Sequence, residues 1–188
     1  MKLKHFFYTV AVLFSFTVVK AQTNVPADFT KGSVTLADGK VVTGFIKDNM
    51  KKFASITFLD NEGNNKKNYE GSDINAVSID NTNYMCLSGD FFKTICIGRI
   101  NFLQKVSNAA GKSTYNGTEA IFNNGTEGKV NDYFTYSNNS LKLLNKKTVE
   151  SFINNDLASN PLAVQNAKAN KGDISKLEEA VKIYNSSN

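Results

Sequence analysis

The feature that most constrains the fold is the alternation of apolar and polar residues that begins at Gly32. Val34 and Leu36 alternate with small or polar neighbours, and Asp38-Gly39 interrupts the pattern before it resumes. A two-residue period is typical of a β-strand with one buried face, and Asp-Gly between two such runs favours a tight hairpin turn. The sequence therefore predicts two antiparallel strands joined at Asp38-Gly39.

Three more short strands are predicted before residue 80. They cover residues 55–59, 66–69 and 76–79, and turn-rich stretches such as DNEGNN separate them. Five short strands within about 50 residues are typical of a small, strongly bent barrel. We assign residues 32–82 to such a barrel, after a flexible lead-in at residues 22–31.

The same region carries a resemblance to known domains. The stretches VTLADGKVVTGFI, ITFLD and SDINAVSI resemble the small-barrel pattern of SH3-like and Sm-like domains. The layout of the whole chain, with a closing helix that ends in YN, is similar to that of uncharacterised secreted proteins of the Bacteroidota. The resemblance implies an SH3-like β-barrel and no particular biochemical activity. Sm-like domains bind RNA, but no basic cluster in this chain supports that activity.

Residues 83–145 are predicted to form a second antiparallel β segment. The apolar residues 84–97 favour a hairpin centred near Phe91, and a strand at 100–106 follows a bend at Gly98. The motif NGTE occurs at 116–119 and again at 124–127, which favours two turns at the ends of a short strand at 120–122. A second hairpin is expected at 133–144.

Residues 146–188 are predicted to be helical. Apolar residues fall on one helical face in 149–157, and Asn160-Pro161 favours the start of another helix. Asp173 or Ser175 is expected to cap the last helix. The fold class we expect is α+β: an N-terminal SH3-like barrel, a second β segment and C-terminal helices packed against it.

The first 21 residues have the pattern of a secretory signal peptide. Lys2 and Lys4 precede an apolar run of about 14 residues, and small residues lead up to Ala21. The run is shorter than the ~20 residues that a membrane-spanning helix needs. We therefore expect export to the periplasm or the extracellular space, with no membrane span left after cleavage.

The composition of the cleaved chain excludes several chemistries. Loss of Lys2, Lys4 and Lys20 would leave 19 basic against 17 acidic residues, and this small excess gives no sign of nucleic-acid binding. The only histidine, His5, would leave with the signal peptide. Without imidazole, Ser-His-Asp catalysis, Cys-His catalysis and His-ligated metal sites are excluded. We predict no cofactor, no metal and no enzymatic activity, and a carboxylate-based hydrolase is the enzymatic alternative.

Cys86 and Cys96 are the two thiols of the chain. Two cysteines in an exported protein often form a disulfide, and these two have the same strand parity. The alternative is a pair of buried free thiols among neighbouring apolar residues. The sequence leaves both open.

Two short motifs have a structural rather than a chemical explanation. Gly111-Lys112-Ser113 lacks the earlier glycine and the following helix of a phosphate-binding loop, so it is interpreted as a turn. Asp60, Glu62 and Asn64 alternate as calcium ligands do, but the later positions of an EF-hand loop are wrong, which favours a hairpin turn.

Without a chemical motif, the sequence favours an interaction or structural module that binds another envelope protein. An added peptide strand at an open barrel edge, or contacts through the Gly/Asn-rich loops, would suffice. The alternative is a small-ligand or glycan binder that uses the aromatic residues Tyr115, Phe122, Tyr133 and Tyr136. That alternative requires these four side chains to lie on one concave face.

Overall fold

Most of the described chain forms one antiparallel β-sheet of ten strands. The computed structural model describes residues 25–110, 113–115, 117, 120–122 and 125–187. Two further strands, β9 (Ser113–Tyr115) and β10 (Ala120–Phe122), pair only with each other. The strands of the large sheet are β1 (Thr30–Leu36), β2 (Val41–Asp48), β3 (Ser55–Asp60), β4 (Lys66–Glu70), β5 (Ile74–Ile79), β6 (Thr82–Leu87), β7 (Asp90–Cys96), β8 (Asn101–Lys105), β11 (Tyr133–Ser137) and β12 (Ser140–Leu144).

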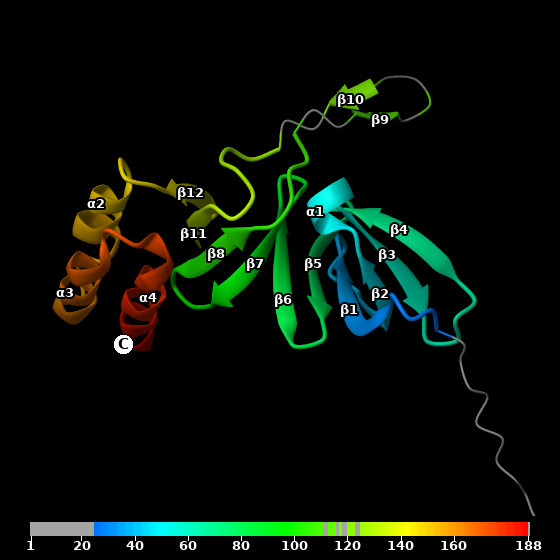
Figure 1. Ribbon diagram of the computed structural model, residues 1–188, viewed down its shortest axis with the longest axis horizontal. Coiled ribbons are helices and arrows are strands. Elements are labelled where there is room, and N and C mark those ends of the chain that lie inside the picture. Colours follow the sequence, from blue (N-terminus) through cyan, green and yellow to red (C-terminus); the bar gives the residue numbers. More distant parts are fainter. Residues whose placement is uncertain (1–24, 111–112, 116, 118–119, 123–124, 188) are drawn as a thin grey trace, which may run out of the picture.

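The strand order places the N-terminal and C-terminal halves of the chain at opposite ends of the sheet. The order is β12-β11-β8-β7-β6-β5-β1-β2-β3-β4. Strands that follow each other in the sequence are neighbours in this sheet, with two exceptions. β5 does not pair with β4 but with β1, which therefore lies between β2 and β5. β8 pairs with β11, because β9 and β10 form the separate ribbon. Figure 1 shows the helices at the β12 end, β4 at the other end, and the ribbon extending beyond the strand ends.

The expected SH3-like barrel over residues 32–82 is wrong. Strands β1 to β5 do form, and the hairpin predicted at Asp38-Gly39 is confirmed by the β1–β2 ladder. However, β5 also pairs with β6, from Ile79↔Thr82 to Ala76↔Met85, and the ladder continues through β7, β8, β11 and β12. The strands of the supposed second segment extend the first sheet, so the result is a large open sheet in which no small barrel closes.

The N-terminal half of the sheet curves around its own core. Strands β1 to β5 enclose Val34, Ile46, Ile56 and Val77, together with Met50 of the short helix α1 (Met50–Phe53). An isolated bridge joins Gly71, just after β4, to Gly89 in the β6–β7 turn. A Cβ at Gly71 would lie 2.2 Å from the carbonyl oxygen of Gly89, so this close approach requires glycine.

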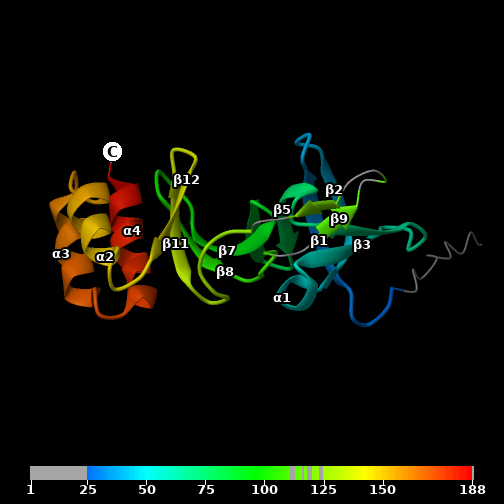
Figure 2. The ribbon, with the colours of Figure 1, turned by 90° about the horizontal axis from the view of Figure 1, so that it is seen from above.

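Helices cover one face of the C-terminal half of the sheet. Figure 2 shows them grouped beside β11 and β12. Phe102 and Leu144 of the sheet pack there against Phe152, Leu157 and Leu177, all nearly inaccessible to solvent. The helical segments are α2 (Val149–Ser151), the π-helix η1 (Phe152–Asp156), α3 (Pro161–Asn170), the 3-10 helix η2 (Ile174–Lys176) and α4 (Leu177–Ser186).

The cap predicted at Asn160 is confirmed, whereas α4, the last helix, begins after Lys176 with no side-chain cap bond. The Asn160 side chain accepts a hydrogen bond from the backbone N–H of Ala163 at 3.1 Å, directly before Pro161. At η2, the Asp173 side chain accepts from the N–H of Ser175 at 3.2 Å, so Asp173 is the capping residue of the two proposed. No described helix is long and apolar enough to cross a bilayer.

The opposite face of the same strands carries a third core. Phe92, Leu103 and Phe134 are fully buried there, and they lie on the other face from Phe91 and Phe102 because adjacent strand residues point to opposite sides. The backbone at Gly128 lies over this core. A Cβ on Gly128 would come within 2.9 Å of the Phe134 ring, and its φ of +77° also favours glycine.

Candidate functional site

Asp90 and Lys105 are the two charged side chains that have no solvent exposure in the described part of the chain. Asp90 begins β7 and Lys105 ends β8, and the ladder register pairs Lys105 with Phe92. Because Asp90 and Phe92 are two residues apart, all three side chains lie on one face of the sheet. The Lys105 ammonium lies 3.1 Å from Asp90 Oδ2, so the two charges form a buried ion pair.

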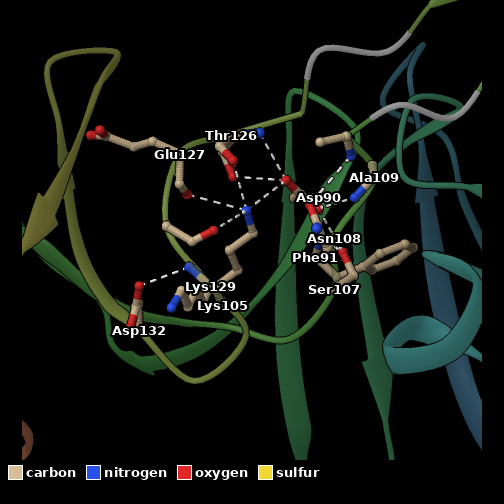
Figure 3. A network of polar contacts seen from close by, with 12 residues as sticks. Asp90, Phe91, Lys105, Ser107, Asn108, Ala109, Thr126, Glu127, Lys129 and Asp132 are labelled. Carbon is tan, nitrogen blue, oxygen red and sulfur yellow. Dashed lines mark hydrogen bonds and ion pairs between the residues drawn. The ribbon is translucent and has the colours of Figure 1, made fainter.

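Both carboxylate oxygens of Asp90 are fully engaged. Oδ1 accepts hydrogen bonds from Ser107 Oγ at 3.0 Å and from the N–H of Ala109 at 2.7 Å. Oδ2 accepts from the N–H and the hydroxyl of Thr126 at 2.8 and 2.7 Å, in addition to Lys105. Figure 3 shows these bonds converging on Asp90 from two separate stretches of chain.

Lys105 holds the second of those stretches. Its ammonium donates to the carbonyl oxygens of Thr126, Glu127 and Gly128 at 2.8, 3.1 and 3.3 Å. Ser107 completes the set because its hydroxyl accepts from the N–H of Phe91 at 2.8 Å. We call Asp90, Lys105, Ser107 and Thr126, with their backbone partners, the Asp90 network.

The Asp90 network fixes both ends of the excursion that carries the β9–β10 ribbon. The first stem, residues 106–110, leaves β8 and is bound through Ser107 and Ala109. The second stem, residues 125–132, returns to β11 and is bound through Thr126, Glu127 and Gly128. Two stems far apart in sequence are therefore joined at one buried carboxylate and one buried ammonium.

The surroundings of Asp90 favour its charged form. Burial alone would raise the pKa of the carboxyl, but the hydrogen bonds from Thr126, Ala109 and Lys105 outweigh burial and lower the pKa below its usual range. A carboxylate with a lowered pKa and no contact with solvent is a poor general base. The arrangement supports a structural role for this pair, and none of the described buried side-chain nitrogen or oxygen atoms lacks a partner.

The cysteines lie too far apart in the ladder to form a disulfide, and both are free. The hairpin expected near Phe91 turns instead at Ser88-Gly89. As a result, Cys86 pairs with Phe91 in the β6–β7 ladder, whereas Cys96 pairs with Phe102 in the β7–β8 ladder. Cys96 is five residues further along β7, which corresponds to about 16 Å. Burial raises the pKa of both thiols, that of Cys86 to about 12, which makes them unreactive.

Tyr133 and Tyr136, two of the four residues of the predicted aromatic surface, do not share a face of the sheet. Tyr133 stacks on Phe102 beneath the helices, with ring centroids 5.4 Å apart. Tyr136 lies against the opposite core, and its hydroxyl donates to Asn139. The two tyrosines are three residues apart in β11 and so face opposite sides. The side chains of Tyr115 and Phe122 lie outside the described residues.

Of the two motifs interpreted as turns, the structure describes the one at Asp60, which forms the β3–β4 turn. Asp60 accepts hydrogen bonds from Asn64 and Asn65 within the β3–β4 turn, and the described residues contain no group of three potential metal ligands. Gly111 and Lys112 lie outside the described residues. Of the eight residues in the two NGTE motifs, four are likewise outside. The short strand expected between them is confirmed as β10.

Asp90 and Lys105 were not among the predicted site residues. The sequence signal that could have identified them is the apolar stretch beside each charge. Asp90 lies in SGDFF and Lys105 in INFLQK. No protein-family model, curated protein or solved structure matches this chain, so the functional argument rests on its own residues.

Proposed function

We propose that the protein is an exported, non-enzymatic module of the cell envelope that binds another envelope protein and uses the β9–β10 ribbon as a contact element. Export is inferred from the N-terminal signal pattern. The absence of histidine from the cleaved chain, together with the complete burial of the Asp90–Lys105 pair, favours binding over catalysis.

One observation carries this proposal. The chain places its buried charges at the base of an excursion whose strands join no other sheet among the described residues. Burying an ion pair costs desolvation energy, so a buried pair is often less stabilising than apolar packing would be. Backbone bonds at Val106 and Asn131 hold only the sheet ends of the two stems. The pair supplies a defined position for the described residues further along each stem, which is useful if the ribbon must meet a partner in one orientation.

The proposal can be tested by cross-linking capture with a ribbon-less variant. In this variant residues 110–125 are replaced by a four-residue Gly-Ser linker, which reaches about 13 Å. Ala109 and Thr126 remain, and since both bind the same carboxylate, the linker can span the gap. The tagged full chain and the variant are each used as bait in an envelope extract from the source cells.

We expect one envelope protein to be captured by the full chain, to be lost on competition with untagged chain, and to be missing from the ribbon-less capture. Equal capture by both baits would show that the ribbon is not the contact element. If the full chain enriches no protein above an unrelated exported domain, the proposed function is wrong.

A further inference from the structure

The two edges of the large sheet differ in how they are protected. At one edge, β4 presents Lys66 and Lys67, both exposed, and lysines on an edge strand discourage pairing with other chains. At the other edge, β12 carries the sequence SLKLL. Its one lysine, Lys142, is neutralised by Asp156 at 2.7 Å, so the β12 edge lacks the protection that β4 has.

The ladder shows which backbone groups of β12 face outward. The hairpin turns at Asn138 and Asn139, both with positive φ, which makes Ser137↔Ser140 a hydrogen-bonded pair. Alternation then directs the N–H and C=O groups of Leu141 and Leu143 away from β11. This direction is supported by Thr148, whose hydroxyl donates to the carbonyl of Leu143 from the outer side at 2.6 Å.

A helical wall lies beside this edge. Residues of α2 and η1, including Ser151 and Phe152, face β12 across a groove of about 390 Å³. The wall includes the π-helical turn, which is closed by the bond from the N–H of Leu157 to the carbonyl of Phe152 at 3.2 Å. Such turns are rare in proteins overall, and many of those known lie at functional sites. Glu127, whose backbone the Lys105 ammonium holds, lines the same groove.

The groove is apolar at its base and balanced in charge. The partly exposed Leu141 and Leu143 supply the accessible apolar surface, and the buried Leu144 and Phe152 lie beneath it. The charged lining residues are two lysines and two acids: Lys142, Lys147, Glu127 and Asp156. An edge strand beside a helix is the geometry in which extended peptides add to a sheet, with main-chain bonds for affinity and alternate side chains for specificity.

We propose that the β12 groove binds an extended, uncharged segment of a partner protein as an additional strand. The segment pairs with the outward N–H and C=O of Leu141 and with the outward N–H of Leu143, whose carbonyl is bound by Thr148. It places apolar or β-branched residues beside those two leucines, and a small uncharged residue between them, facing Lys142. Pairing ends at Thr148, which already occupies the outer side of Leu143. This surface is separate from the ribbon and does not rest on the proposed function.

A second copy of the chain fits this edge less well. Antiparallel pairing that matches Leu141 with Leu143 of the copy is centred on Lys142. The bond from Lys142 to Asp156 brings η1 to the same point, so the two helical walls would meet there. A single peptide strand avoids this conflict.

The test is selection of a displayed library of random seven-residue linear peptides on the full chain, followed by fluorescence anisotropy with the enriched peptides. Leu143→Pro removes an outward N–H and leaves the pairs with β11 in place, as proline on an edge strand allows. Ser151→Trp fills the groove without changing β12. Lys66→Pro is the matched control, since alternation from the Asp60–Asn65 bond directs the Lys66 N–H outward on the other edge.

We expect enriched peptides with alternating apolar or β-branched residues. Their binding should weaken at least tenfold in both Leu143→Pro and Ser151→Trp and stay unchanged in Lys66→Pro. Three results would overturn the inference: no enriched sequence, equal binding to all four proteins, or a concentration-dependent dimer of the wild type that Leu143→Pro abolishes. The ribbon-less variant should bind the peptides normally, which separates this test from that of the proposed function.

Discussion

The substitution Asp90→Asn tests whether charge pairing holds the excursion in place. Asparagine is nearly the size of aspartate and can still accept from Ser107 and Ala109, but it removes the charge that faces Lys105. The Lys105 ammonium would keep its three carbonyl partners and lose its counter-charge at a position without solvent contact. Breaking a buried pair in this way costs about 3–5 kcal/mol.

That cost is a large part of the 5–15 kcal/mol that stabilises an ordinary domain. For a chain of this length it corresponds to a decrease in Tm of about 6–20 °C. The measurement is urea unfolding followed by far-ultraviolet circular dichroism, with linear extrapolation to water. Asp156→Asn is the control, because Asp156 pairs with the half-exposed Lys142, and such pairs contribute about 0–1 kcal/mol.

Two further readouts connect the loss to the stems. In Asp90→Asn the amides of Ala109 and Thr126 should lose protection from hydrogen exchange, because both donate to the carboxylate. The double variant Asp90→Asn with Lys105→Met should be more stable than Asp90→Asn alone, since it removes the unpaired charge. If Asp90→Asn costs no more than Asp156→Asn, or if the double variant is no better than the single one, the reasoning is refuted.

Three other outcomes are expected. Because the folded pKa of Asp90 is lowered, the stability from its charge is fully present above the unfolded pKa of about 3.9 and is lost as the pH falls through the folded pKa. In urea titrations at decreasing pH, the free energy of unfolding should therefore fall more steeply in wild type than in Asp90→Asn. Parallel curves for the two proteins would contradict this. Cys86 and Cys96 should resist iodoacetamide in the native state and take up one label each in urea, whereas a mass change on reduction alone would indicate a disulfide. Asn160→Ala should cost about 2 kcal/mol in urea unfolding, since it removes the cap of α3 and the bonds to Ile183 and Ser187; a loss below about 0.5 kcal/mol would show that the cap is dispensable.

Local features were predictable from the sequence because their causes are local. The turn at Asp38-Gly39 depends on two residues, and the caps at Asn160 and Asp173 depend on side chains that bond within three positions. The hairpin centre near Phe91 was wrong by about two residues because the Ser88-Gly89 turn signal was overlooked within an apolar run.

The fold class was wrong for a non-local reason. Short strands of the kind found in β1 to β5 fit a small barrel or an open sheet equally well, and the outcome depends on which strand takes the free edge of β5. The structure places β6 there, through Ile79↔Thr82. The Asp90 network was missed for a similar reason, since Thr126 lies 36 positions from Asp90 and no short motif connects them.

The position of β1 between β2 and β5 has a consequence for how the chain folds. The β1–β2 hairpin pairs residues that are close in the sequence. The other edge of β1 stays unpaired until β5 has formed, because Val34 pairs with Val77, 43 positions further along the chain. Pairing over such a separation is slow compared with hairpin formation. During synthesis, when the N-terminal part emerges first, β1 to β4 can therefore form a sheet with one unprotected edge along residues 32–36. The arrival of β5 both closes that edge and joins the two halves of the molecule, which makes the β1–β5 contact the step at which folding competes with aggregation.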